Sequence, residues 1–318
     1  MNKALILGIN GQDGSFLAEI LLDKGYEVHG LVRKTAKDNL QNIKKIINDV
    51  KLHYGDLSDA ISIQKAIKLS RPSEIYNEAD QDHAGISFDI PSYNFDITGS
   101  AVGRILEIIK NTNTNIKYFQ PVTSNMFGNI KASPQNEDTP FFPLSPYACA
   151  KVFAYHLCKM YRTNYKMFIS TATFYNHESE RRTENYVTRK ITKAAARISL
   201  GLQKELVLGD LSAKIDWGYA KEYMEAAWQI MQLTEPSDYI IGTGIETSVE
   251  EFAKKTFNYL NMDYKKFIKT SNEFIRPAKN LSLIADSSKA RKDFGFSPKI
   301  KIDELIKIMV DHDLKEQK

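Results

Sequence analysis

The amino-acid sequence predicts an α/β fold built on a doubly wound, largely parallel sheet. Two observations support this prediction: the chain opens with a strand, a glycine turn and a helix, and strand-like and helix-like runs then alternate through its first half. No low-complexity stretch or Pro/Gly-rich linker divides the 318 residues, so we expect one compact body.

The opening unit predicts a dinucleotide site. A strand at 3–8 leads into three glycines, and a helix follows at 15–24. Glycines at this spacing allow a tight turn and a close approach of the backbone to a pyrophosphate, while the helix N-terminus offers its amides to the phosphates. The residues expected to hold the cofactor here are Gly8, Asn10, Gly11, Gln12, Asp13 and Gly14.

The end of the second strand, at 26–32, discriminates between cofactors. An acidic residue there would bind the ribose hydroxyls of NAD, whereas an arginine accommodates the 2′-phosphate of NADP. Arg33 and Lys34 stand at this point, and the first carboxylate after the end of the strand is Asp38. These residues favour NADP, and NAD stays open because Arg33 could instead stack on the adenine.

The remaining elements continue the alternation of strands and helices. Ligands of such sheets lie beyond the carboxyl ends of the strands, so Thr123, which follows a strand at 116–122, is expected in the site. The predicted elements also include strands at 51–57 and from 74, and helices at 58–70, 100–111, 188–200, 221–233 and 302–311.

Tyr147 and Lys151 are the pair expected to carry the chemistry. Residues four apart on a helix share a face, so the phenol would lie beside an ammonium that favours the phenolate. Such a tyrosine can take the proton of an alcohol while hydride leaves the same carbon. The spacing alone does not select this pair, because pairs that begin at Tyr155 and Tyr186 share it.

Composition excludes several classes of function. The 43 basic and 39 acidic residues are mixed along the sequence, which predicts an ordinary solvated surface rather than a nucleic-acid-binding patch. No run reaches the roughly 18 apolar residues of a membrane helix. Cys149 and Cys158 have no metal-ligand companions and are expected to be reduced. Without a signal segment, the expected location is the cytoplasm.

These features together resemble the extended branch of the short-chain dehydrogenase/reductase superfamily, and within it the GDP-mannose 4,6-dehydratase family. The superfamily pattern is a GxxGxxG turn, a Ser/Thr after a central strand, and Tyr-x-x-x-Lys on the next long helix. The stretches that carry the resemblance are GINGQDG at 8–14, GYEVHG at 25–30, HYGDL at 53–57, SPY at 145–147, NHES at 176–179, VTRKI at 187–191 and DWG at 216–218.

The resemblance implies a domain organisation and a set of roles. It implies a Rossmann-type dinucleotide-binding domain at 1–175, rejoined by parts of 212–245, a smaller interleaved sugar-nucleotide-binding α/β lobe mainly at 176–318, and a homodimer or homotetramer. It makes Tyr147 the proton acceptor and Lys151 the residue that lowers its pKa and holds the nicotinamide ribose, while Thr123 binds the reacting hydroxyl. It places Asp56 and Leu57 beside the adenine, and Ser124, Asn176, Val187, Lys190 and Arg276 around the substrate.

The chain departs from that family at Asn125. A 4,6-dehydratase oxidises C4, removes the C5 proton, expels water from C6 and returns hydride to C6. The family has a glutamate where Asn125 stands, and an amide cannot act as an acid or a base near neutral pH. The chain departs from the family in two further ways. Three carboxylates stand in place of apolar and small residues, at Glu78, Asp80 and Asp82. Two expected nucleotide contacts are changed, at Ile215 and Lys279.

The function predicted from these residues is C4 oxidation of a GDP-linked manno-configured hexose or heptose, with hydride transfer to NADP or NAD. Three alternatives stay open. They are a 4,6-dehydratase that uses Asp80 or Asp82 as a substitute base, a 4-epimerase or 4-keto reductase, and a cofactor-binding sensor without turnover. The three acidic residues would share one face if the preceding strand continued through them, and they are otherwise solvated loop residues.

Overall fold

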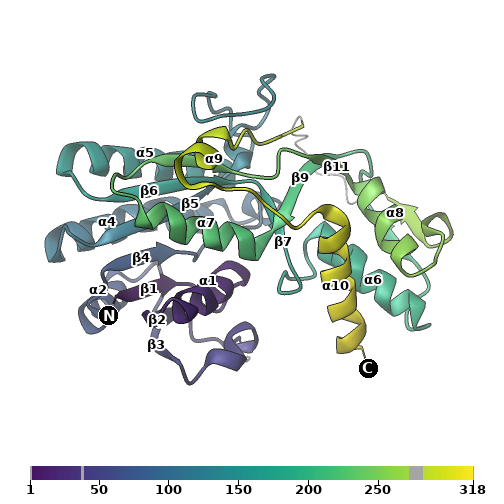
Figure 1. Cartoon of the computed structure of the whole chain (residues 1–318), viewed down its shortest axis with the longest axis horizontal. Coiled ribbons are helices and arrows are strands. Elements are labelled where there is room, and N and C mark those ends of the chain that lie inside the picture. The colour runs from purple at the N-terminus through teal and green to yellow at the C-terminus, as the bar shows by residue number, and fades with distance from the viewer. Residues whose placement is uncertain (1, 37–38, 272–281, 318) are drawn as a thin grey trace.

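The computed structural model describes residues 2–36, 39–271 and 282–317, and it confirms the predicted fold class (Figure 1). In this part of the chain the main sheet has seven strands in the order β10-β6-β5-β4-β1-β2-β3. Every neighbouring pair in it is parallel, and the order reverses between β1 and β4. The strands are β1 Lys3–Leu7, β2 Glu27–Val32, β3 Val50–Tyr54, β4 Glu74–Asn77, β5 Lys117–Thr123, β6 Ile169–Phe174 and β10 Asp238–Ile241.

Helices cover both faces of this sheet, which is why its central strands read as continuous apolar runs. Ala4 and Ile6 of β1 belong to the core on one face, with α1 (Gln12–Asp23) and α7 (Ala220–Gln232). Leu5 and Leu7 point to the opposite core, which is covered by α2 (Ala60–Ser70), α4 (Ala101–Thr112) and α5 (Pro146–Tyr165). Alternate side chains of one strand therefore build two separate cores.

A smaller lobe is formed by later segments of the chain. Its strands β7 (Asn176–Glu178), β9 (Lys214–Tyr219) and β11 (Glu246–Ser248) form one sheet, and β8 (Leu206–Leu208) pairs with β12 (Ile268–Thr270). Figure 1 shows α6 (Val187–Ser199), α8 (Val249–Tyr259) and α10 (Ile302–Glu316) gathered on this side of the molecule. Their apolar faces enclose a core around Trp217, Phe252 and Phe257.

The two parts are interleaved along the sequence. After β7 and α6 have entered the smaller lobe, the chain returns to the main sheet as α7 and β10, and again as α9 (Ser288–Phe294). The last helix, α10, then packs in the smaller lobe. Among the helices of the described residues, none combines the length and the apolarity that a membrane span requires.

Most predicted elements differ from the observed ones by only a few residues. The helix predicted from Ser15 begins at Gln12, because Gly11 is extended and the helix starts directly after it. The helix predicted to end at Asp311 continues to Glu316, where Asp313 is buried against Arg189. The sequence did not predict the π-helix η3 (Phe95–Ser100), which continues the short helix α3 (Pro91–Asn94) into α4. The remaining short helical turns are η1 Gln41–Ile46, η2 Ile86–Phe88, η4 Ser124–Met126 and η5 Tyr264–Lys266.

Candidate active site

The glycine turn forms the cradle that the sequence predicted between β1 and α1. Gly8 has φ +81°, a conformation that glycine adopts without strain, and a Cβ on it would lie 2.9 Å from the Ala79 backbone. A Cβ on Gly14 would lie 2.3 Å from the Gly8 carbonyl oxygen. The cradle is therefore closed to side chains and open to the backbone approach that a dinucleotide needs. These residues fit such a cofactor.

One cavity, of about 450 Å³, extends from this turn along the ends of β2 and β3. Arg33 contributes to its wall and donates a hydrogen bond from Nη1 to the Tyr93 hydroxyl at 2.9 Å. The Asp56 carboxylate accepts hydrogen bonds from the Ser58 amide and hydroxyl. The predicted cofactor residues that line this cavity are Gly8, Asn10, Gly11, Arg33, Asp56 and Leu57.

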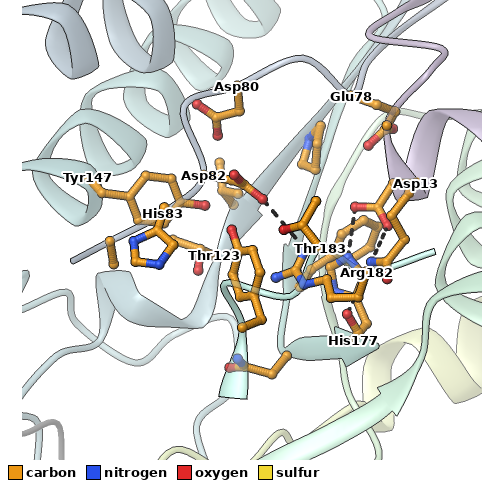
Figure 2. A pocket seen from close by; sticks show the side chains of 18 of the residues that line it. Asp13, Glu78, Asp80, Asp82, His83, Thr123, Tyr147, His177, Arg182 and Thr183 are labelled. Carbon is orange, nitrogen blue, oxygen red and sulfur yellow. Dashed lines mark hydrogen bonds and ion pairs between the residues drawn. The ribbon is translucent and has the colours of Figure 1, made fainter. Parts of the chain in front are cut away.

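A second cavity, of about 380 Å³, adjoins the first where Asn10 and Gly11 line both. Figure 2 shows Tyr147 and Thr123 on one side of a pocket and Asp13 on the other. This arrangement brings the predicted catalytic residues to the glycine turn, at the point where the strand order reverses. The predicted site residues that line it are Asn10, Gly11, Gln12, Asp13, Thr123, Asn125, Tyr147, Lys151 and Asn176.

Tyr147 and Lys151 lie one turn apart at the start of α5. The helix begins there because the Ser145 hydroxyl accepts a hydrogen bond from the Ala148 amide and Pro146 occupies the first turn. Both side chains are buried, with Tyr147 7% and Lys151 5% exposed. The Lys151 ammonium lies 5.8 Å from the centre of the Tyr147 ring.

The pKa of Tyr147 is not lowered in this structure, although Lys151 lies on the same helix face. Burial raises the pKa of the phenol well above its usual value of 10.0, and the charges of Asp80 and Asp82 raise it further, while the hydrogen bond with Thr123 opposes them. The Lys151 ammonium itself is paired with two other groups. Lys151 Nζ lies 2.6 Å from Asp80 Oδ2 and donates a hydrogen bond to the Pro121 carbonyl at 2.9 Å.

Thr123 and Asn125 form a local hydrogen-bonded unit at the end of β5. Thr123 Oγ1 accepts a hydrogen bond from the backbone N–H of Asn125 at 3.3 Å and another from the side-chain Nδ2 of Asn125 at 3.1 Å. Thr123 also lowers the pKa of the Tyr147 phenol through a hydrogen bond, although burial outweighs this effect, so Thr123 links Asn125 to the catalytic tyrosine.

The acidic segment after β4 does not continue as a strand, because β4 ends at Asn77. Glu78, Asp80 and Asp82 nevertheless all line the two cavities. Burial raises the pKa of Glu78 well above its usual value of 4.5, with the Asp13 charge adding to the effect. The Asp82 side chain is 55% exposed and lies 3.5 Å from Arg182. The segment is therefore part of the site rather than a solvated loop.

Sequence reasoning assigned no role to His177 or Arg182, which also line the second cavity. His177 Nε2 lies 2.8 Å from Asp13 Oδ2, and although burial lowers the pKa of the imidazole, Asp13 outweighs burial and raises it. Arg182 lies 3.4 Å above the centre of the Tyr186 ring. The matching stretch at 176–179 was the signal that could have pointed to His177.

Several predicted substrate residues lie elsewhere in the structure. Ser124 is buried, and Ser124, Val187 and Lys190 are not among the residues that line these two cavities. Lys190, on α6, donates a hydrogen bond to the Val207 carbonyl at 3.0 Å. Ile215 packs against the core of the smaller lobe. Arg276, together with Lys279, lies outside the described residues.

Comparison with known proteins agrees with this geometry. A family model described as GDP-mannose 4,6 dehydratase matches residues 5–309. The GDP-mannose 4,6 dehydratase 2 of Arabidopsis thaliana is 44% identical over 323 residues, which cover 98% of this chain and 86% of that protein.

Solved structures share the fold at low identity. The dTDP-glucose 4,6-dehydratase of Bacillus anthracis, in complex with NAD, gives a TM-score of 0.87 at 20% identity and covers 100% of this chain and 98% of its own. RMD from Pseudomonas aeruginosa, complexed with NADPH, gives a TM-score of 0.84 at 18% identity, with 99% and 100% covered.

Proposed function

Because the chain belongs to the GDP-mannose 4,6-dehydratase family, we propose that it oxidises C4 of a GDP-linked manno-configured sugar and releases the 4-keto product. The observation that carries this proposal is Asn125, an amide hydrogen-bonded to Thr123 at the position where the resemblance leads us to expect a glutamate. The fold is common to solved structures of a dehydratase and of epimerases, so the fold does not decide the reaction and the proposal depends on this side chain.

The nicotinamide cofactor supplies the acceptor for the C4 hydride, and the glycine turn with Gly8, Gly11 and Arg33 would hold it. Arg33 favours NADP, because a guanidinium pairs with a 2′-phosphate. The chain's own residues handle the proton. Thr123 orients the C4 hydroxyl, and Tyr147 accepts its proton while the C4–H bonding electrons leave as hydride. The sugar becomes a ketone, and one equivalent of cofactor is reduced.

Dehydration requires two further proton transfers. A base must remove the C5 proton that the C4 ketone has acidified, and an acid must protonate the departing C6 oxygen. Asn125 can do neither, and loss of a general acid/base group lowers a rate by roughly 10²–10⁴-fold. The C4 oxidation uses only Thr123, Tyr147 and Lys151, so it is retained.

Product analysis with GDP-mannose and a GDP-linked manno-heptose tests the proposal. We expect reduced nicotinamide, measured by absorbance, in equal amount to a product that has lost two hydrogens. A 4-keto-6-deoxy product without net reduction contradicts it, and so does a 4-epimer. Tyr147→Phe should lower the rate by at least about 10²-fold. Unchanged activity in this variant would contradict the role of Tyr147, and the absence of any reduced nicotinamide with either sugar would favour a sensor without turnover.

Exchange of Asn125 provides a sharper test. Asn125→Glu restores a carboxyl group, and we expect it to produce dehydrated sugar that the unaltered protein does not make. Asn125→Gln is the matched control, since it has the length of glutamate without its acid/base chemistry. If both variants, or neither, form the 4-keto-6-deoxy product, residue 125 does not decide between oxidation and dehydration.

A second candidate is dehydration with Asp82 as the substitute acid/base. Asp82 lines the same cavity as Tyr147 and its side chain is largely exposed there, whereas Asp80 is already paired with Lys151. Deuterium from solvent would then appear at C5 of a dehydrated product, and Asp82→Asn would abolish its formation. Under the C4 oxidation reading, Asp82→Asn leaves the stoichiometric oxidation in place.

A further inference from the structure

Asp80 connects the loop beyond β4 to the catalytic helix α5. Its Oδ2 lies 2.6 Å from Lys151 Nζ, and its Oδ1 accepts a hydrogen bond from the Thr98 hydroxyl. The Lys151 and Asp80 side chains are only 6% and 12% exposed. A pair shielded from water in this way is screened by salt much less than a surface pair.

Further hydrogen bonds fix the positions of both Asp80 and Lys151. Thr98 is buried in the π-helix η3, and its hydroxyl also accepts a hydrogen bond from Asn94 Nδ2 at 3.4 Å. Asn94 Nδ2 in turn donates to Gln81 Oε1 at 2.6 Å. On the other side, the Pro121 carbonyl holds Lys151 at 2.9 Å. The ammonium is therefore fixed between a carboxylate and a carbonyl.

The carboxylate changes what the ammonium can do for the phenol. A lone unit charge about 6 Å from a phenol, at an effective dielectric constant of about 20, shifts its pKa by roughly 2 units. An opposite charge in contact with it cancels most of that effect. The titratable groups that face Tyr147 or Lys151 from the surrounding elements are Glu78, Asp80, Asp82, His83, Cys158 and Tyr186.

We propose that Asp80 is a positioning residue, which holds the Lys151 ammonium and thereby sets the pH at which Tyr147 accepts the proton. The inference concerns this chain's own residues, Asp80 and Lys151. The inference rests on the proposed function only in that Tyr147 takes a proton from a sugar hydroxyl. C4 oxidation, dehydration and epimerisation all begin with that step.

The first test observes Tyr147 directly, without turnover. In the protein labelled with ¹³Cζ-tyrosine, the Tyr147 resonance is assigned by its absence in Tyr147→Phe and is then titrated with pH. Asp80→Asn keeps the size of the side chain and an oxygen that can accept from Thr98, so it should fold normally. We expect Tyr147 to titrate at least about 1 pH unit lower in Asp80→Asn than in the unaltered protein. An unchanged titration overturns the proposal.

The second test is the pH dependence of kcat/KM. Asp80→Asn should shift the acid limb of the profile to lower pH by a similar amount, while the rate at the optimum changes by only a few fold. Asp82→Asn is the matched control, because it removes a carboxylate that also faces Tyr147 but that does not contact Lys151. Equal shifts in both variants overturn the proposal, since loss of any negative charge would then suffice.

The two readouts separate this inference from the proposed function. If the product is a 4-epimer, the proposed function fails, and the pH profile of that reaction still tests Asp80. If the product is dehydrated sugar, the proposed function also fails, and the resonance titration tests Asp80. If neither sugar reacts, the resonance titration alone decides.

Discussion

Glu78 is half-buried and lines both cavities, between the glycine turn and the catalytic residues. Among the described residues its Oε1 has no hydrogen-bond partner, and burial and the nearby Asp13 charge raise its pKa well above 4.5. The folded protein therefore binds a proton that the unfolded chain releases above pH 4.5. Stability contributed by the protonated form is present at low pH and is lost as the pH rises from there toward the folded pKa.

We expect Glu78→Gln, or the family-like Glu78→Leu, to remove this pH dependence. The free energy of unfolding of the unaltered protein should fall with rising pH, by at most about 1.4 kcal/mol per pH unit from this one group. Each variant should gain stability relative to the unaltered protein as the pH rises above 4.5, measured by urea denaturation at several pH values. Parallel curves for variant and unaltered protein would show that Glu78 ionises freely in the fold.

The sequence predicted those site residues whose positions follow from regular helices and strands. Tyr147 and Lys151 share a helix face, and Thr123 ends a central strand, so periodicity and strand order bring them together. The sequence did not predict that Asp80 pairs with Lys151. Asp80 lies on an irregular segment whose path depends on the π-helix behind it, and no local pattern in the sequence encodes that path. The acidic residues were visible in the sequence, but their contacts were not.

At the scale of elements, α6 and α10 are held together by an ion pair inside the smaller lobe. Arg189 of α6 and Asp313 of α10 are both buried, and Arg189 Nη1 donates to Asp313 Oδ1. Arg189 Nε also donates to the Arg182 carbonyl at 3.1 Å, which ties this pair to a residue of the catalytic cavity.

Asp313→Ala should lower the free energy of unfolding by about 3 kcal/mol or more, because it leaves the Arg189 charge buried without its partner. Glu316→Ala is the matched control. Glu316 also approaches Arg189, at 3.5 Å, but its side chain is 43% exposed, so we expect a loss of no more than about 1 kcal/mol. Chemical denaturation measures both, and equal losses would mean that burial of the pair is not what stabilises this contact.

At the scale of the whole molecule, the main sheet is completed by segments that follow the first 175 residues. β10 pairs with β6 along four residues, and α7 packs beside α1, where Met224 and Ile230 join the core that contains Phe16 and Leu21. α9 then packs against β10. A division of the chain near residue 175 would therefore cut β10 away from the other six strands of the main sheet.

This interleaving predicts how fragments of the chain behave. Residues 1–175 alone leave β6 as an unpaired edge and uncover the apolar face of α1, so we expect this fragment to aggregate or to lack a cooperative thermal transition. Co-expression with residues 176–318 restores β10, α7 and α9, and we expect a soluble complex of the two fragments. Circular dichroism and size-exclusion chromatography test this. A soluble 1–175 fragment that melts cooperatively would show that the first six strands suffice, and that the later segments dock on a finished domain.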